Sequence, residues 1–297
     1  MLKAQGSKLK AHGSWLSPFM IGIFDSGVGG LSVLREIRAQ MPAARLMYVG
    51  DTAHVPYGPR PMPQICEFSE GVTRFLLGQG ARVIVIACHT ASAAALKYLR
   101  ARFPDVPFVG MEPAVKPAAE ITQSKVIGVL ATQVTFQGEL FASVVTRFAD
   151  TQNVRVLTQV CAGLVQQIEA GELDTPKTEV MLRGWVEPIL AQGADALVLG
   201  CTHYPFIAPL LQKICDSQTP QRPVRIINPA PAVARQVARV AAGLADGADT
   251  PAQGRTHYYA SGDIDDFRRA LRRLLGINRR ANAVRWRDGR IVDSDSR

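Results

Sequence analysis

A short apolar run that ends in a cysteine occurs twice in the chain. Residues 77–90 read Leu-Gly-Gln-Gly-Ala-Arg-Val-Ile-Val-Ile-Ala-Cys-His-Thr, and residues 190–203 read Leu-Ala-Gln-Gly-Ala-Asp-Ala-Leu-Val-Leu-Gly-Cys-Thr-His. An apolar run of this length between turn residues is typical of a buried parallel strand. Open α/β sheets bind their ligands beyond the carboxyl ends of such strands. The repeat therefore predicts two similar half-molecules that present Cys88 and Cys201 to a shared cleft.

The order of elements along the chain predicts the fold class. Apolar runs that we expect to be strands alternate with stretches that we expect to be helices. Besides the two repeated runs, the expected strands are residues 20–24, 45–50, 106–110, 126–132, 154–159, 224–227 and 257–260, and the expected helices include 31–39, 63–78, 90–102, 231–244 and 263–275. This alternation predicts an α/β protein with two pseudo-symmetric, doubly wound domains, mainly parallel sheets and an active site in the cleft between the domains.

A second internal repeat indicates where the domains divide. Residues 126–132 repeat the pattern of residues 21–26, so we expect the chain to start a second domain there. The last part of the chain has no counterpart in this repeat, and we expect it to return to the first domain. The first domain is therefore expected to comprise residues 20–115 and 226–297, and the second residues 116–225.

The composition limits the classes of protein that we expect. The chain has 297 residues, enough for two domains, and its 47% hydrophobic and 20% charged residues are typical of a soluble globular protein. No apolar run approaches the ~20 residues of a membrane-spanning helix, and residues 1–19 lack the apolar core of a signal peptide. We therefore expect an N-terminal extension at residues 1–19, no membrane partner and a cytoplasmic location.

The charged residues and cysteines carry few specific signals outside the repeat. The net charge of +9 allows an anionic partner, but no nucleic-acid motif is present and we expect no nucleic-acid partner. We interpret the C-terminal excess of arginine as a solvated basic helix. The five cysteines include no C-x-x-C pair and no Cys/His cluster at zinc spacing, so we expect neither a disulfide framework nor a metal. The arginines concerned are Arg268, Arg269, Arg272, Arg273, Arg279, Arg280, Arg285, Arg287 and Arg290.

A glycine-rich turn at residues 25–30 follows the first expected strand. Its spacing departs from the dinucleotide motif G-x-G-x-x-G because the last position is Ser32, so we do not expect a dinucleotide site. Glycine instead lets the backbone approach a small ligand, with Asp25 and Ser26 directed into the same space. Asp25 could alternatively serve only as a turn or capping residue.

Two further loops place polar groups at the ends of expected strands. Residues 51–58 follow the second strand, with His54 and Tyr57 at the tip of the loop. Loops in this position of α/β folds often carry ligand contacts. Glu112 follows the strand at residues 106–110, so a carboxylate is expected at the same edge of the sheet.

Two opposed thiols are suited to the inversion of a carbon acid. One thiolate removes a proton from one face of a tetrahedral carbon, and the other thiol donates a proton to the opposite face. The pKa of a model cysteine, ~8.5, leaves both protonation states accessible. Asp25 and Glu112 are candidate bases beside Cys88, and His203 is the candidate beside Cys201. We interpret the other cysteines as structural, namely Cys66, Cys161 and Cys215.

Four motifs, in the same order, resemble those of the cofactor-independent glutamate racemases. They are Phe-Asp-Ser-Gly-Val-Gly-Gly at residues 24–30, Asp-Thr-Ala-His-Val-Pro-Tyr-Gly at 51–58, Ala-Cys-His-Thr-Ala-Ser at 87–92 and Gly-Cys-Thr-His-Tyr-Pro at 200–205. The resemblance extends from Ile21 to about Leu275. It implies the interconversion of L- and D-glutamate, with D-glutamate supplied to bacterial peptidoglycan, and it implies neither pyridoxal phosphate nor a metal.

The resemblance also implies roles for individual residues. Cys88 and Cys201 would be the two acid/base thiols, with Cys88 acting on D-glutamate and Cys201 on L-glutamate. A homodimer is implied as well. The implied substrate-binding residues are Asp25, Ser26, Tyr57, Gly58, His89, Thr90, Thr202 and His203.

One position departs from the family pattern. Asn usually follows the first cysteine, whereas this chain has His89 there. A neutral imidazole also offers one donor and one acceptor, but its larger ring could weaken substrate binding or shift the neighbouring thiol. Because imidazole ordinarily titrates near ~6.5, substrate binding could also depend on pH.

Three other functions remain open from the sequence. Aspartate racemases also use paired cysteines, but they tend to have an acidic residue after Cys-Thr, where this chain has His203. A cysteine hydrolase could pair Cys88 with His89, although adjacent residues rarely face one another and Cys201 would have no role. The third is a binding or regulatory protein with an impaired racemase site, which the departure at His89 keeps open.

Overall fold

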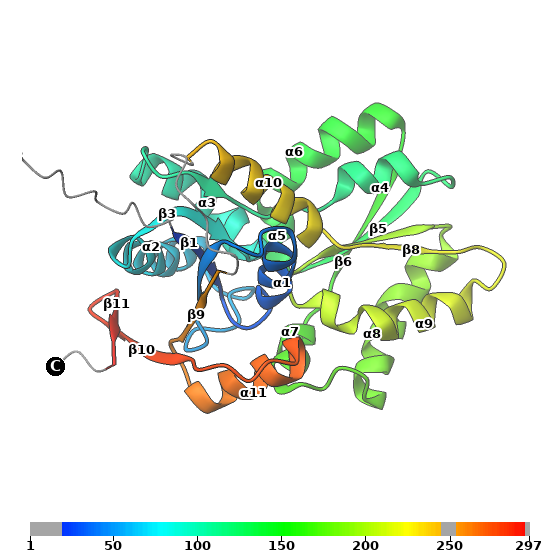
Figure 1. The fold of residues 1–297 in the computed structure, drawn as a ribbon. Helices are drawn as coiled ribbons and strands as arrows, with labels where there is room; N and C mark the ends of the chain where they lie inside the picture. Colours follow the sequence, from blue (N-terminus) through cyan, green and yellow to red (C-terminus); the bar gives the residue numbers. More distant parts are fainter. Residues whose placement is uncertain (1–19, 245–253, 295–297) are drawn as a thin grey trace, which may run out of the picture.

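The computed structural model describes residues 20–244 and 254–294, which form two α/β halves joined side by side (Figure 1). The first half contains a seven-stranded sheet and the second a four-stranded sheet. In spatial order the first sheet consists of β11 (Arg290–Asp293), β10 (Asn282–Arg287), β9 (Thr256–Ala260), β2 (Arg45–Gly50), β1 (Met20–Asp25), β3 (Ala81–Ile86) and β4 (Phe108–Val109). The second consists of β6 (Arg155–Val160), β5 (Val126–Ala131), β7 (Ala196–Gly200) and β8 (Arg225–Ile227).

The two sheets share one arrangement around a central strand. β1 pairs in parallel with β2 and β3, and β5 pairs in parallel with β6 and β7. Gly22 lies opposite Ile84 and Gly128 lies opposite Leu197, so the two cysteine-bearing strands keep the same register in both halves. Among the described strands, only β10 and β11 pair antiparallel. The prediction of an α/β fold with two mainly parallel sheets is confirmed.

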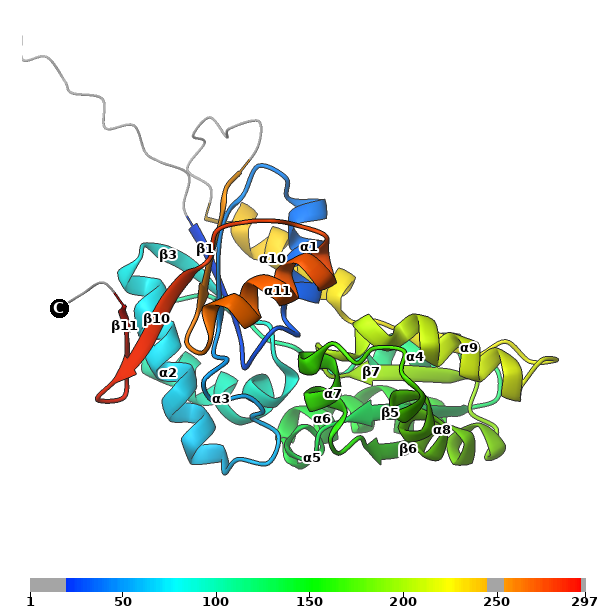
Figure 2. The ribbon, with the colours of Figure 1, turned by 90° about the horizontal axis from the view of Figure 1, so that it is seen from below.

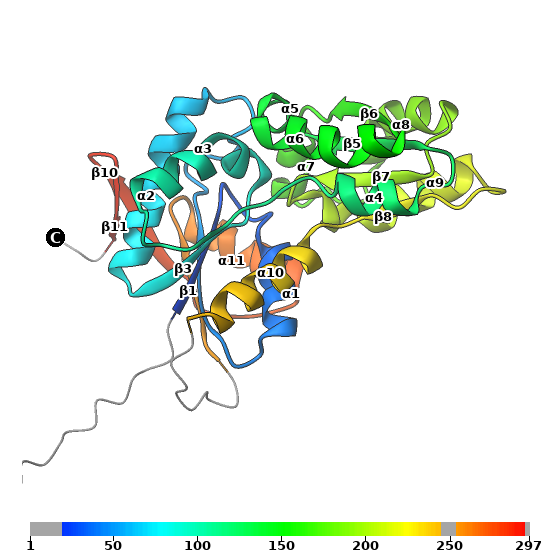
Figure 3. The same ribbon diagram turned by 90° about the horizontal axis from the view of Figure 1, so that it is seen from above.

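Helices cover both faces of each sheet, which buries the central strands and explains their apolar sequences. On the first sheet, α1, α10 and α11 pack on one face and α2 and α3 on the other, an arrangement that Figure 3 shows for β1 and β3. On the second sheet, α7, α8 and α9 pack on one face and α4 and α6 on the other (Figure 2). The helices are α1 (Leu31–Gln40), α2 (Met62–Gly78), α3 (His89–Arg102), α4 (Val115–Ile121), α5 (Gln133–Gln137), α6 (Glu139–Val144), α7 (Leu164–Ala170), α8 (Pro176–Ala191), α9 (Ala208–Gln218), α10 (Ala230–Ala242) and α11 (Ile264–Leu275).

The chain passes between the halves twice. It leaves the first half after β4 and returns after β8, because α10 packs against α1 on the first sheet. The boundary expected at residue 226 falls inside β8, which belongs to the second sheet. We therefore propose that residues 20–113 and 229–294 form the first domain and residues 114–228 the second. The expected N-terminal extension lies outside the described residues.

The sequence predicts one solvated helix for the C-terminal arginines, but the structure does not form it. Only the first four, Arg268 to Arg273, lie on α11, and the chain after this helix forms the β10–β11 hairpin. Asp288 and Gly289 make its two-residue turn with φ angles of 49° and 70°. Both angles are positive, as a type I′ hairpin turn requires. The hairpin extends the first sheet beyond β9.

None of the helices in the described part of the chain is long and apolar enough to cross a membrane.

Candidate active site

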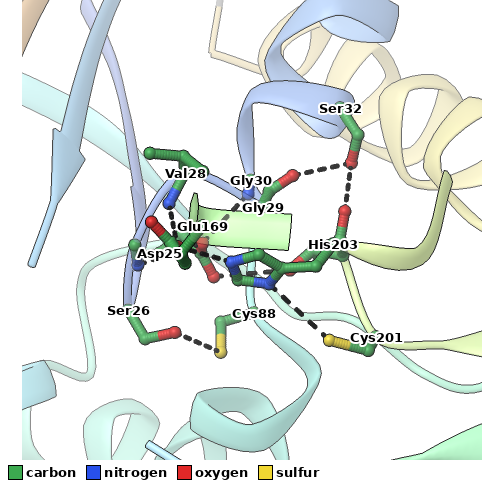
Figure 4. Close-up of polar contacts among 12 residues, drawn as sticks. Asp25, Ser26, Val28, Gly29, Gly30, Ser32, Cys88, Glu169, Cys201 and His203 are labelled. Atoms are coloured by element: carbon green, nitrogen blue, oxygen red, sulfur yellow. Dashed lines mark hydrogen bonds and ion pairs between the residues drawn. The ribbon is translucent and has the colours of Figure 1, made fainter. Parts of the chain in front are cut away.

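Cys88 follows β3 and caps the N-terminus of α3. Its sulfur accepts a hydrogen bond from the backbone N–H of Ala91 at 3.4 Å and donates one to Ser26 Oγ at 3.8 Å (Figure 4). The residue is only 4% exposed. Burial raises the pKa of the Cys88 thiol well above its ordinary value, and the negative charges of Asp25 and Cys201 raise it further. Figure 4 shows the Cys88 and Cys201 side chains among the same group of polar contacts between the halves.

Cys201 occupies the equivalent place after β7. It contacts His203, which in turn contacts Glu169. The Sγ atom lies 3.7 Å from His203 Nδ1, and His203 Nε2 lies 2.6 Å from Glu169 Oε1 (Figure 4). Burial alone would lower the pKa of His203. Its hydrogen bonds and charge interactions with Cys201 and Glu169 outweigh burial, and the pKa lies well above 6.5. The ring is therefore placed to hold a proton beside the sulfur at neutral pH.

Glu169 is a member of this site that the sequence analysis missed. It lies on α7, and Oε1 also accepts a hydrogen bond from the backbone N–H of Val28 at 2.8 Å. The glutamate and the glycine turn are 141 residues apart in the chain. No motif or spacing connects them, so only the folded arrangement reveals the contact.

The glycine turn packs directly on this pair. A Cβ atom on Gly29 would collide with the His203 ring, and one on Gly27 would collide with the Glu169 carboxylate. These glycines therefore permit close approach between the two halves, rather than the approach of a dinucleotide.

Asp25 forms the turn and also contacts the second half. Its Oδ2 atom accepts hydrogen bonds from the N–H groups of Gly27 and Gly30 at 3.1 and 3.0 Å. Its Oδ1 atom accepts a bond from Thr202 Oγ1 at 3.4 Å. The side chain is completely buried, and burial raises the pKa of its carboxyl above the ordinary value despite the nearby charge of His203. The alternative of a turn residue alone does not account for the contact with Thr202.

Hydroxyl groups connect the halves on the Cys88 side. Thr90 Oγ1 lies 2.9 Å from Thr132 Oγ1, which in turn lies 2.9 Å from Thr135 Oγ1. A Cβ atom on Gly58 would lie 3.3 Å from Thr132, so the loop at residues 51–58 also reaches the second half. Thr132 and Thr135 were missed from the sequence, although Thr132 occupies the same place after β5 that Ser26 occupies after β1.

Tyr57 has its hydroxyl engaged within its own loop. The hydroxyl donates to Asp51 Oδ2 at 2.7 Å, and the side chain is 1% exposed. Contact between the substrate and this segment would therefore come from the backbone of Tyr57 and Gly58, rather than from the phenol.

Two expectations from the sequence need correction. Glu112 is exposed, whereas Cys88 is buried, which argues against the Glu112 carboxylate as a base for this thiol. Burial lowers the pKa of His89 to about 3. The imidazole is therefore neutral over the range in which enzymes are assayed, which argues against a pH dependence of binding near 6.5 through His89.

His89 also forms no dyad with the neighbouring thiol. It is 2% exposed, and neither ring nitrogen makes a hydrogen bond of good geometry within the described residues, although the backbone of Glu112 lies near enough to oppose slightly the effect of burial on the pKa of His89. The hydrolase interpretation needs a Cys88–His89 pair, so this geometry disfavours it. Within residues 20–244 and 254–294, no group of three or more His, Cys, Asp or Glu side chains is placed to hold a metal ion.

Known proteins are similar to this chain in sequence and in fold. The family model described as Asp/Glu/Hydantoin racemase matches residues 21–237. The chain belongs to this racemase family. A glutamate racemase of Ectopseudomonas mendocina (strain ymp) is 51% identical over 256 residues, which cover 86% of this chain and 94% of that protein.

Solved glutamate racemases have the same fold. Isoform RacE1 from Bacillus anthracis superposes with a TM-score of 0.78 at 28% identity, covering 90% of this chain and 97% of that one. The enzyme from Francisella tularensis subsp. tularensis SCHU S4, in complex with D-glutamate, gives a TM-score of 0.77 at 25% identity, covering 91% and 98%. The resemblance inferred from the four motifs is confirmed.

Proposed function

We propose that this racemase interconverts L- and D-glutamate by proton transfer between two cysteines and the α-carbon. One observation carries the proposal: Cys88 and Cys201 follow equivalent strands of sister sheets, and both side chains are buried. The glutamate racemase relatives and the D-glutamate complex of one of them support the choice of substrate.

The proposed reaction moves one proton at each face of the carbon. With D-glutamate, the Cys88 thiolate takes the α-proton, the electron pair delocalises into the substrate carboxylate, and the Cys201 thiol donates a proton from the other side. With L-glutamate, the two sulfurs exchange these roles. The assignment of Cys88 to the D-enantiomer rests on the family resemblance.

The surroundings of the two sulfurs differ, and this bears on how each reaches its reactive form. His203 and Glu169 can hold or return a proton at Cys201. Within the described residues, the hydrogen-bond partners of Cys88 are the neutral groups of Ser26 and Ala91, and its raised pKa favours the thiol. The ammonium group of a bound amino acid would oppose this shift, because a nearby positive charge favours a thiolate. We therefore infer that substrate binding activates Cys88.

Neutral donors are proposed to hold the two carboxylates of the substrate. Hydroxyl groups from both halves make hydrogen bonds around Cys88, Asp25 and Thr132, and each can donate a hydrogen bond to a carboxylate oxygen. These residues are Ser26, Thr90, Thr132, Thr135 and Thr202. Together with the backbone at Tyr57 and Gly58, they account for most of the binding residues that the family resemblance implies.

The proposal is tested by circular dichroism of D-glutamate, L-glutamate and both enantiomers of aspartate, each incubated with the protein without added pyridoxal phosphate. Loss of optical activity for glutamate, but not for aspartate, is the expected result. Preferential turnover of aspartate would favour the aspartate racemase alternative. No turnover of either, with glutamate still binding, would favour a regulatory protein.

Gly29→Ala is expected to lower kcat/KM for glutamate on the order of 100-fold, which is typical of a catalytic group displaced by about 1 Å. The added methyl group would push the His203 ring away from Cys201. Initial rates by circular dichroism measure the effect. Gly184→Ala is the matched control because a Cβ there meets no atom within 4 Å. Full activity of a folded Gly29→Ala protein would show that the position of His203 is unimportant.

His89→Asn is expected to leave kcat/KM unchanged or to increase it. The amide keeps one acceptor and offers donors in a smaller volume, and it replaces a buried ring whose nitrogens make no hydrogen bond of good geometry within the described residues. The same assay, at several pH values, measures this. A large loss of activity would show that the imidazole of His89 has a role of its own.

The biological setting follows from the proposed reaction and from the resemblance. D-glutamate would supply peptidoglycan synthesis. A homodimeric assembly and a cytoplasmic location are also proposed from the resemblance alone.

A further inference from the structure

A buried carboxylate, outside the thiol pair, connects three distant parts of the first half. Asp51 is completely buried. Its Oδ1 atom accepts hydrogen bonds from Ser261 Oγ at 2.6 Å and from Trp286 Nε1 at 2.7 Å. Its Oδ2 atom accepts a bond from Tyr57 OH at 2.7 Å and lies 2.9 Å from His54 Nδ1. Four groups therefore satisfy the two oxygens of one carboxylate that water does not reach.

Trp286 brings the C-terminal hairpin into this network. It lies on β10, and its ring packs at 5.6 Å from Phe68 and at 5.0 Å from His54, measured between ring centroids. Helix α2 makes room for the indole at Gly71, where a Cβ atom would lie 2.5 Å from Trp286 Cζ3. Glycine weakens a helix interior, so its presence in the middle of α2 is explained by this packing.

The network leads from the hairpin to the candidate active site. Tyr57 is held by Asp51 through its hydroxyl, while its ring belongs to the same apolar cluster as Cys88. The next residue, Gly58, packs against Thr132 of the second half. Residues 57 and 58 contact the apolar cluster of Cys88 and the second half, and the hydrogen bond from Tyr57 to the Asp51 carboxylate holds them in place.

We propose that Trp286 is a positioning residue, which acts through Asp51 and Tyr57 to hold the loop at residues 51–58 in its substrate-binding position. The inference rests on the proposed function. Without the indole N–H, Asp51 Oδ1 keeps a single donor, and a buried carboxylate that lacks donors rearranges or recruits water. The loop would then spend less time in the conformation that meets the substrate, which weakens binding more than it alters proton transfer.

The test compares Trp286→Phe, which keeps an aromatic ring but lacks the N–H, with Trp185→Phe on α8 as the control. KM for both enantiomers is expected to rise roughly 10-fold in Trp286→Phe, the factor that corresponds to one lost hydrogen bond to a charged group. The expected change in kcat is less than about threefold, as for loss of uniform binding. The Trp185→Phe protein is expected to keep the wild-type values.

A second variant reaches the indole from the other side. Gly71→Ala keeps Trp286 and changes no residue of the loop, but its methyl group would displace the Trp286 ring and press on the carbonyl oxygen of Gly289 in the hairpin turn. It is expected to raise KM as Trp286→Phe does, whereas Gly184→Ala, in the interior of α8 with no atom within 4 Å of its Cβ, is not. Wild-type KM values in folded Trp286→Phe or Gly71→Ala would overturn the proposal, as would a fall in kcat alone.

The rate at which iodoacetamide alkylates Cys88, located by peptide mass spectrometry, gives a readout independent of turnover. The loosened loop in Trp286→Phe is expected to speed this reaction, and D-glutamate is expected to protect the variant only at higher concentrations than the wild type. If wild-type protein fails to racemise glutamate, the proposed function is wrong. If alkylation of Cys88 is nevertheless unchanged in the variant, the positioning role is wrong as well.

Discussion

Cys88→Ala and Cys201→Ala will each lose racemisation in both directions, by at least about 1,000-fold, because each variant lacks a group that must carry a proton in every turnover. Enantiomers have equal free energies, so kcat/KM must fall by the same factor for D- and L-glutamate. Initial rates of change in circular dichroism, started from each enantiomer, measure the loss. The effect is expected to be the largest of any single substitution in the protein.

Controls for these variants come from the other cysteines. Cys66→Ala and Cys215→Ala remove thiols that lie in helices α2 and α9, and are expected to keep wild-type rates. A single-cysteine variant of the pair that racemises glutamate at more than a few per cent of the wild-type rate would contradict the roles assigned to the two sulfurs.

Glu169→Gln is expected to lower kcat/KM on the order of 100-fold, within the range ascribed to general acid–base groups. The carboxylate helps to keep the pKa of His203 well above 6.5. Without that charge the ring loses its proton at a lower pH and no longer supports proton transfer at Cys201. The rate of the variant should therefore fall at a lower pH than that of the wild type, which pH profiles of kcat measure. Superimposable profiles would contradict a role for this pair.

The same substitution has a defined effect on stability. A histidine whose folded-state pKa is raised stabilises the fold fully below its unfolded pKa of about 6.5, and this contribution disappears as the pH rises through the folded-state value. The free energy of unfolding should therefore fall by about 2 kcal/mol in Glu169→Gln at pH 6, where a buried imidazolium has lost its partner, and by less at pH 9. Urea unfolding at both pH values measures the difference. An equal loss at both would show that the charge of His203 contributes nothing.

The fold and the equivalent positions of the two thiols after sister strands could be predicted because the signals that specify them are short in sequence. Each cysteine follows a buried apolar run and a Gln-Gly-Ala turn, and these local patterns recur in one register. The sequence also placed Asp25 and Thr202 at the carboxyl ends of strands, where the structure shows them in contact. The family motifs then added the substrate class.

The residues that were missed depend on contacts across the two halves. Glu169 contacts His203 and Val28 from α7, and no motif in the sequence around it predicts these contacts. For Glu112 the sequence suggested a base beside Cys88 that the structure does not favour, because a position after a strand gives no information on where the side chain points. The burial of His89, which makes its ring neutral, likewise depends on surroundings that only the folded chain provides.

The C-terminal hairpin was missed although a signal for it was present. Asp288 and Gly289 form a turn dipeptide between stretches in which apolar and charged residues alternate, as in Val284 to Arg287. This pattern is a strong indicator of a two-residue hairpin. The arginine-rich composition favoured a solvated helix instead, although the apolar residues alternate with the two-residue period of a strand.

The isotopic pattern at the α-carbon early in the reaction tests the account most directly. D-glutamate is incubated with the protein in D2O, and both enantiomers are separated and analysed by mass spectrometry before a tenth of the substrate has reacted. If two sulfurs flank one carbon, the L-glutamate formed carries one deuterium and the recovered D-glutamate carries almost none. Deuterium that enters recovered substrate as fast as product would mean that a single group serves both faces, and the opposed-thiol account would be wrong.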